Sequence, residues 1–154
     1  MQALLKLIKN PVKPGIALLN FFSPLLDLAI RIYIADIFFK SGLTKIRDWD
    51  TTLSLFQNEY HVPILPVPLA AVMGTGAELL LPILLVIGLA TRFGAAGLFI
   101  LNIVAVISYP ELGEVAVREH FHWGVLLAVI LLHGPGKISL DHFIWPRLLR
   151  KAGH

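Results

Sequence analysis

The sequence contains no cysteine, and only 15% of its residues are charged. Without cysteine there is no disulfide scaffold, no thiolate metal site and no cysteine nucleophile. An intrinsically disordered chain is also excluded, because it would need high charge and few apolar residues. The charges form no dense basic stretch, since 13 Lys and Arg stand against 10 Asp and Glu. Nucleic acid is therefore not an expected partner.

Apolar residues take the place of the missing charge. They make up 56% of the 154 residues, and the mean hydropathy is +0.77. A domain this small leaves much of its surface outside any core, so that surface must face lipid. We therefore expect an all-α, polytopic membrane protein whose first partner is the lipid bilayer.

Four segments are long enough to cross about 30 Å of hydrocarbon, which takes roughly 20 helical residues. We expect these spans at about residues 24–43, 66–89, 92–109 and 118–134. The first span contains four charges, but they are spaced i,i+4 and can pair along a helix face. These pairs are Asp27 with Arg31 and Asp36 with Lys40. The prediction is a single domain, 1–154, built as a bundle of four transmembrane helices.

Basic residues predict the orientation of the bundle, because they favour the cytoplasmic side. With four spans, both termini share one side of the membrane. That side holds more basic residues than the other: Lys6, Lys9, Lys13, Arg92, Lys137, Arg147, Arg150 and Lys151 against Lys40, Lys45, Arg47 and Arg118. Both termini are therefore expected to be cytoplasmic. The long outer loop, 44–65, is expected to contain a short helix around Trp49–Tyr60.

The two ends of the chain lie outside the predicted spans. Residues 1–20 are expected to lie on the cytoplasmic surface, with a short amphipathic helix over Met1–Lys9 that Pro11–Pro14 separates from the first span. Residues 135–154 are expected to form a cytoplasmic tail. At its start, Lys137, Asp141 and His142 are expected to cap the helix that ends there, the fourth span, and to tie the tail to the surface.

Three stretches of sequence resemble the DoxX family of small four-helix membrane proteins. They are RIYIADIFFKSGLTKI, GTGAELLLPILLVIGLATRFG and HWGVLLAVILLHGPGKISLDH. The resemblance covers about residues 25–142, and its most specific parts are the AELL…GLATR junction and the HGPGKISLDH ending. It implies a multi-pass protein of a bacterial inner (plasma) membrane. Some members resemble the membrane subunit of thiosulfate:quinone oxidoreductase, which implies a quinone and a soluble or membrane-bound redox partner.

Ionisable side chains inside lipid are energetically costly, so each is expected to be paired with another group or to serve a function. From a rise of about 1.5 Å per residue, Arg31, Glu78 and Asn102 are expected to meet near the centre of the bundle. One interpretation is structural: an Arg31–Glu78 salt bridge that Asn102 caps. The other is a catalytic centre in which the three residues bind a quinone headgroup or relay protons. Asp27 is a competing partner for Arg31, and both interpretations stay open.

A second polar layer is expected nearer the outer face. Asp36 and Lys40 are predicted to approach His120 and His122, which makes Asp36, Lys40 and His122 the candidate cofactor-binding residues. Interfacial hydrogen bonding, proton or quinone chemistry and metal binding all stay open for this cluster. On a helix, however, the two His rings point about 200° apart, so no metal ligands are assigned.

Quinone is the one cofactor that these features suggest. The sequence lacks the Gly-rich dinucleotide motif, and no second span offers a deep His for a haem, so no flavin, nicotinamide or haem is expected. The leading hypothesis is an accessory or quinone-coupling subunit of a membrane redox complex, with no complete active site of its own. The alternatives are a non-redox accessory or transport protein in metal handling, and a structural membrane anchor. Homo-oligomerisation stays open.

Overall fold

The computed structural model describes residues 2–152, with side chains over residues 13–148, and Met1 of the predicted N-terminal helix lies outside this range. The regular secondary structure of the described residues is entirely α-helical. Its helices are α1 (Gln2–Arg47), α2 (Trp49–Asn58), α3 (Val67–Ile87), α4 (Thr91–Ser108), α5 (Glu114–His133) and α6 (Leu140–Ala152). Four of them are long and apolar enough to cross a membrane: α1 over Lys13–Arg47, and α3, α4 and α5 along their full lengths. The prediction of an all-α protein with four spans is confirmed.

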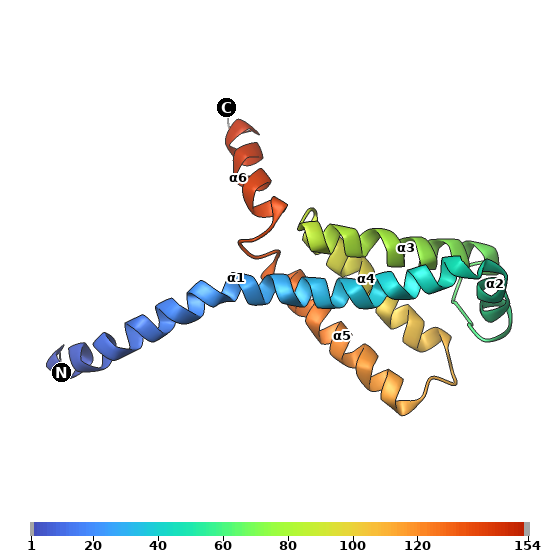
Figure 1. Cartoon of the computed structure of the whole chain (residues 1–154), viewed down its shortest axis with the longest axis horizontal. Coiled ribbons are helices and arrows are strands. Elements are labelled where there is room, and N and C mark those ends of the chain that lie inside the picture. Colours follow the sequence, from blue (N-terminus) through green and yellow to red (C-terminus); the bar gives the residue numbers. More distant parts are fainter. Residues whose placement is uncertain (1, 153–154) are drawn as a thin grey trace.

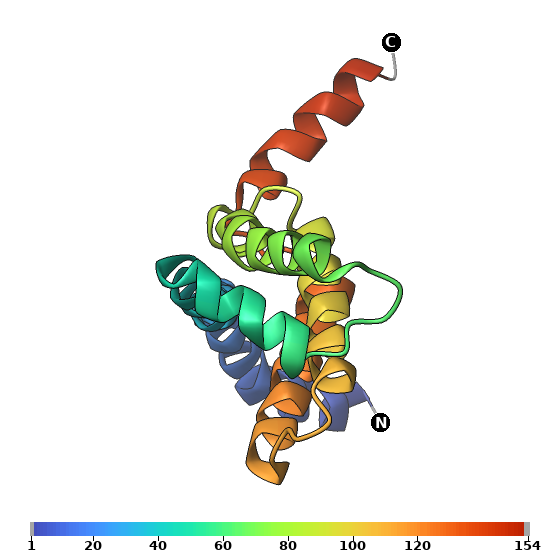
Figure 2. The same cartoon turned by 90° about the vertical axis from the view of Figure 1, so that its right-hand side faces the viewer.

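The four long helices pack in chain order, α1 against α3, α3 against α4 and α4 against α5. Figure 1 shows that α2 lies at one end of this bundle, while α6 and the N-terminal part of α1 leave it at the other end. Figure 2 looks onto the end that carries α2. The N-terminal part of α1 and α6 therefore lie towards one end of the molecule, as an even number of spans requires.

The predicted break between an N-terminal surface helix and the first span is wrong. α1 runs without interruption from Gln2 to Arg47 and includes Pro11 and Pro14. A proline removes one helical hydrogen bond and favours a kink, but it does not have to end a helix. The result is one long helix whose first half extends away from the other helices (Figure 1).

The core lies where α1, α3, α4 and α5 meet. Its fully buried apolar side chains include Ile34, Leu85, Leu98 and Leu127. The outward faces of the same helices are apolar too, and their most exposed side chains include Leu80, Phe93, Phe121 and Leu132. A helix that is apolar all round belongs in lipid. The inward faces therefore hold the bundle together, and the outward faces contact the membrane.

The short helix predicted around Trp49–Tyr60 is confirmed by α2. Its N-cap is Asp48, whose carboxylate accepts hydrogen bonds from the backbone N–H of Thr51 at 3.0 Å and from its hydroxyl at 2.6 Å. These bonds hold the pKa of Asp48 below its usual range. Phe56 of α2 is buried against α3, next to Ala70 and Ala71. α2 thus covers one end of the α1–α3 pair.

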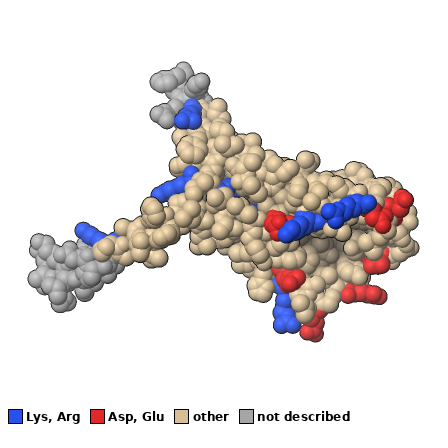
Figure 3. Space-filling model, viewed as in Figure 1, with Lys and Arg blue, Asp and Glu red and all other residues tan. Residues whose placement is uncertain are grey.

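Charge is distributed unevenly along the bundle. Figure 3 shows acidic side chains gathered at the end that carries α2 and the α4–α5 connection. The acidic residues of those segments are Asp48, Asp50, Glu59, Glu111, Glu114 and Glu119. Since acidic residues contribute little to orientation, the cytoplasmic placement of the termini rests on Lys and Arg and stays a prediction.

Candidate functional site

Arg31 is almost completely buried, at 1% exposure, and it connects three parts of the chain. From α1, its Nη1 donates to the carbonyl oxygen of Leu85 in α3 at 3.1 Å, and its Nη2 donates to the carbonyl oxygen of Ile138 after α5. The predicted Arg31–Glu78 salt bridge is therefore wrong. Leu85 lies near the end of α3, about two helical turns beyond Glu78, so the two charges sit at different depths.

The turn between α3 and α4 packs tightly on Arg31. Gly88 ends α3 with φ of +69°, a left-handed conformation. A Cβ at this position would lie 2.5 Å from Arg31 Nη1 and 2.5 Å from Ser139 Cβ. The Gly88 carbonyl oxygen accepts the Asp141 backbone N–H at 2.8 Å. Only glycine provides both the conformation and the space for this contact.

Asp141 binds the start of α4. Its carboxylate oxygens accept the backbone N–H groups of Ala90 and Thr91, both at 2.8 Å. Burial raises the pKa of Asp141, but the hydrogen bonds from Thr91, Ala90 and Trp145 outweigh it, so the pKa lies below the usual value. Asp141 does cap a helix, but the helix is α4, the third span, and not the fourth span that the sequence had indicated. The GLATR and HGPGKISLDH sequences thus form one polar assembly around Arg31.

A cleft of about 1060 Å³ opens beside this assembly, between α1, the start of α4, the end of α5 and α6. Charged and titratable side chains from these four helices and from the α5–α6 connection line it. They are Asp27, Arg92, His133, Lys137, Asp141 and His142. Sequence reasoning missed this cleft, because its residues come from the ends of three separate predicted spans and from the predicted cytoplasmic tail.

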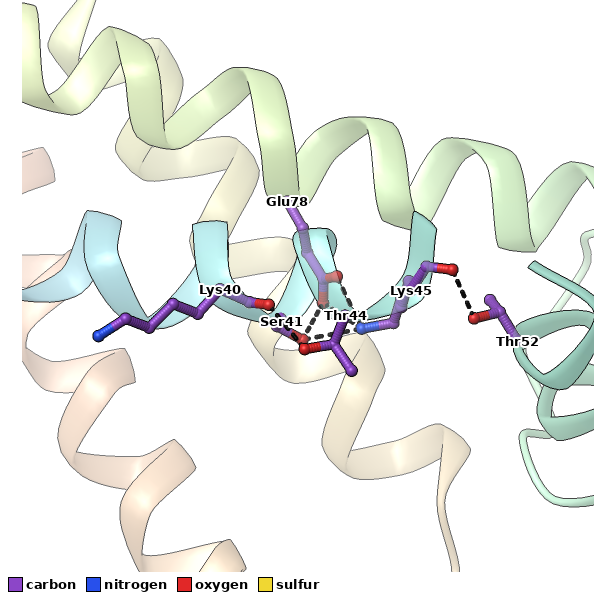
Figure 4. Close-up of polar contacts among 6 residues, drawn as sticks. All are labelled: Lys40, Ser41, Thr44, Lys45, Thr52 and Glu78. Atoms are coloured by element: carbon purple, nitrogen blue, oxygen red, sulfur yellow. Dashed lines mark hydrogen bonds and ion pairs between the residues drawn. The ribbon is translucent and has the colours of Figure 1, made fainter. Parts of the chain in front are cut away.

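Glu78 pairs with Lys45 near the other end of the bundle (Figure 4). The Lys45 Nζ lies 2.7 Å from one Glu78 oxygen and 2.9 Å from the other, and the Ser41 hydroxyl donates to Glu78 at 3.2 Å. The side chains are 20% and 12% exposed for Lys45 and Glu78. Lys45 thus neutralises the Glu78 carboxylate inside the membrane. Sequence reasoning had placed Lys45 in the outer loop.

Asn102 does not join Arg31 or Glu78 but bonds to His120 across the α4–α5 contact. Its Nδ2 donates to the His120 carbonyl oxygen at 2.9 Å, and its Oδ1 lies 2.8 Å from His120 Nδ1. Because an amide oxygen only accepts, Nδ1 of His120 carries the proton and Nε2 carries the lone pair. The imidazole also packs against Trp123, with ring centroids 4.7 Å apart.

This pair lies in the wall of a second, mainly apolar groove of about 430 Å³ between α4 and α5. Its apolar lining includes Phe99, Ile103, Ile107, Phe121 and Val125. Asn102 and His120 are the polar exceptions. A small number of fixed polar groups in an apolar wall is typical of a site for a small, mainly apolar molecule.

The candidate cofactor-binding residues do not come together. Asp36 and Lys40 form an ion pair of 2.7 Å along α1, with 54% and 71% of their side chains exposed. His120 bonds to Asn102, and the expected approach of Asp36 and Lys40 to His120 is not observed. His122 is exposed on α5. Among the side chains that the structure describes, no three His, Asp or Glu lie close enough together to hold a metal ion.

Comparison with known proteins places this geometry in a family. The DoxX family model matches residues 26–110, which run from the middle of α1 to the end of α4. An uncharacterised protein of Haemophilus influenzae is 32% identical over 126 residues, which cover 76% of this chain and 82% of the Haemophilus protein. No solved structure matches the chain significantly.

Proposed function

The chain belongs to the DoxX family, and from that premise we propose that it is a quinone-binding membrane subunit of a redox complex. The observation that carries the proposal is the hydrogen-bonded pair of Asn102 and His120 in the wall of the apolar α4–α5 groove. No side chain in that wall carries electrons, so they would come from a partner protein. The site is accordingly assigned to Asn102 and His120, and not to Arg31, Glu78, Asp36, Lys40 or His122.

A quinone has a long apolar tail and a headgroup whose two carbonyl oxygens accept hydrogen bonds. The groove suits the tail, because its apolar side chains reach the lipid-facing surface of α4 and α5. Phe121 is 70% exposed there, next to the partly exposed Ile103 and Val125. The tail would remain in the bilayer while the headgroup contacts the polar pair.

His120 would be the residue that exchanges protons with the quinone, and Asn102 would hold it in place. With Nδ1 bonded to Asn102, the neutral ring has its lone pair on Nε2 and can accept a hydrogen bond from a quinol hydroxyl. The protonated ring can donate from Nε2 to a quinone oxygen. Histidine suits this exchange because each imidazole nitrogen can bind or release a proton.

The test is photo-labelling of the purified protein in nanodiscs with a photoreactive quinone analogue, followed by mass spectrometry of the labelled peptides. Wild-type protein should be labelled on α4 and α5. The variant His120→Gln should lose about tenfold in labelling, because removal of one good hydrogen bond to the headgroup costs about 1.4 kcal/mol. His122→Gln is the matched control, since it lies two residues away on the exposed side of α5.

Two results would contradict the proposal: labelling spread evenly over the lipid-facing helices, or equal labelling of the two His variants. Thermal unfolding of both variants shows whether His120→Gln remains folded. A metal-handling role predicts that wild type retains a transition metal after dialysis and that the quinone analogue labels no segment preferentially. A structural anchor predicts neither metal retention nor preferential labelling.

A further inference from the structure

We propose that the cleft between α1 and α6 binds the headgroup of a zwitterionic phospholipid with a primary ammonium. In this assignment Arg92 and Lys137 hold the phosphate, and Asp27 holds the ammonium. The site is separate from the α4–α5 groove, so it does not depend on the proposed quinone function.

The cleft lies at the depth where phospholipid headgroups are found. α3 ends at Ile87, α4 begins at Thr91 and α5 ends at His133, so these three spans reach the membrane boundary together. The volume of about 1060 Å³ is large enough for a headgroup and its glycerol. Trp145 of α6 lines the cleft, and tryptophan is typical of the membrane–water interface.

Two cations in the cleft have no anionic partner among the side chains that the structure describes. Arg92 donates to the Leu132 carbonyl oxygen at 3.3 Å, and its guanidinium packs over Gly134. Among the described side chains, neither Arg92 nor Lys137 has a carboxylate within ion-pair distance. Asp141 lies in the same cleft, but its oxygens are bound to the first turn of α4. The two cations are therefore available to a phosphate, which arginine binds in a bidentate geometry.

Asp27 provides the opposite charge in the same cleft. Its side chain is 21% exposed, and its nearest ionisable partner is His133, whose Nδ1 lies 4.0 Å from Oδ1. Arg31, one turn further along α1, bonds instead to the carbonyl oxygens of Leu85 and Ile138. Asp27 is thus a half-buried carboxylate that can accept hydrogen bonds from a ligand.

These charges distinguish among the common headgroups. A purely anionic headgroup would satisfy Arg92 and Lys137 but would be repelled by Asp27. A choline headgroup has no N–H to donate to the carboxylate. A phosphoethanolamine headgroup offers a phosphate and an ammonium with three donors, and therefore matches both signs. Phe93 also lines the cleft and is 68% exposed, so acyl chains can follow the outer face of α4 from there.

The experiment is native mass spectrometry of the full chain, released from nanodiscs that contain equal amounts of phosphatidylethanolamine, phosphatidylcholine and phosphatidylglycerol. Wild type should retain phosphatidylethanolamine preferentially. Asp27→Asn should abolish the preference over phosphatidylcholine while lipid binding persists. Arg92→Gln should lower retention of all three lipids about tenfold, as expected for loss of a charge-assisted hydrogen bond to phosphate.

Matched controls come from the other end of the bundle, where Asp50→Asn and Arg118→Gln remove exposed charges and should leave the lipid profile unchanged. Equal retention of the three lipids by wild type would overturn the proposal, as would unchanged profiles in Asp27→Asn and Arg92→Gln variants that unfold at the wild-type temperature. Glycerophosphoethanolamine, which has no acyl chains, separates a lipid from a soluble ligand. If it displaces the lipid at equal concentration, the ligand is a soluble phosphodiester and the lipid assignment fails.

Discussion

Asp141 and Thr91 are 50 residues apart in the chain, yet the Asp141 carboxylate accepts the Thr91 backbone N–H at 2.8 Å. The first N–H groups of a helix have no partner within the helix. The residue at the N-cap of α4 is Ala90, whose side chain cannot accept a hydrogen bond. The start of α6 therefore supplies the cap that the local sequence of α4 lacks, and it ties the C-terminal segment to the bundle.

Replacement of Asp141 should destabilise the whole bundle. Asp141→Ala leaves the Ala90 and Thr91 N–H groups without their acceptors, and loss of a helix cap costs roughly 1–2 kcal/mol. We expect a lower unfolding temperature in detergent, measured by circular dichroism. Asp50→Ala, an exposed acid of α2, should have little effect. Equal unfolding temperatures for wild type and Asp141→Ala would show that the cap contributes nothing.

The contribution of Asp141 should also depend on pH. Its pKa in the folded protein lies below the ordinary value of 3.8, so the folded state takes up the proton less readily than the unfolded chain. The stabilisation is present above the unfolded pKa and is lost as the pH falls through the lower folded pKa. The stability difference between wild type and Asp141→Ala should therefore shrink from about pH 5 to pH 3. Asp48 also has a lowered pKa, but it titrates in both proteins, so its effect cancels in the stability difference between them. A stability difference that stays constant over this pH range would contradict the assignment.

The spans and α2 could be predicted from local sequence, because length, hydropathy and a capping Asp act within a few turns of helix. The partners of the buried polar residues could not. Arg31, Glu78 and Asn102 were assigned similar depths from separate helix starts. Arg31 instead bonds to Leu85 near the end of α3 and to Ile138 after α5, so it lies closer to that end of the bundle than the count placed it. Glu78 instead meets Lys45, and Asn102 meets His120.

The Asp141–Thr91 contact was beyond sequence reasoning for a different reason. It joins two segments that hydropathy places in separate loops, and a non-local hydrogen bond leaves no periodic pattern in the chain. The signal that was available is the resemblance itself, since its two most specific stretches, GLATR and HGPGKISLDH, meet in the structure.

Glu78 should act through structure and not through quinone chemistry. Glu78→Gln leaves the Lys45 charge unpaired inside the membrane, so we expect a loss of stability. The double variant Lys45→Met, Glu78→Gln should lose less stability than the two single variants lose together. The difference is the coupling energy, which is roughly 0.5–3 kcal/mol for residues in contact. Thermal unfolding of the four proteins measures this coupling. Labelling by the quinone analogue should not change in Glu78→Gln. A strong decrease in labelling of a folded Glu78→Gln variant would show that Glu78 contributes to quinone binding.

Close packing of α1 on α3 requires glycine at position 42. A Cβ on Gly42 would lie 2.9 Å from Leu79 Cγ and 3.1 Å from Glu78 Cβ, so the Leu79 side chain or the helix packing would have to shift. Alanine in place of glycine favours a helix by about 1 kcal/mol, but overpacking costs about 1–3 kcal/mol. We therefore expect Gly42→Ala to lower the unfolding temperature. Gly76→Ala is the matched control, because a Cβ there has no neighbour within 4 Å and only the helical gain remains. Equal or higher stability of Gly42→Ala than of Gly76→Ala would show that the α1–α3 contact is loose enough to accept a side chain.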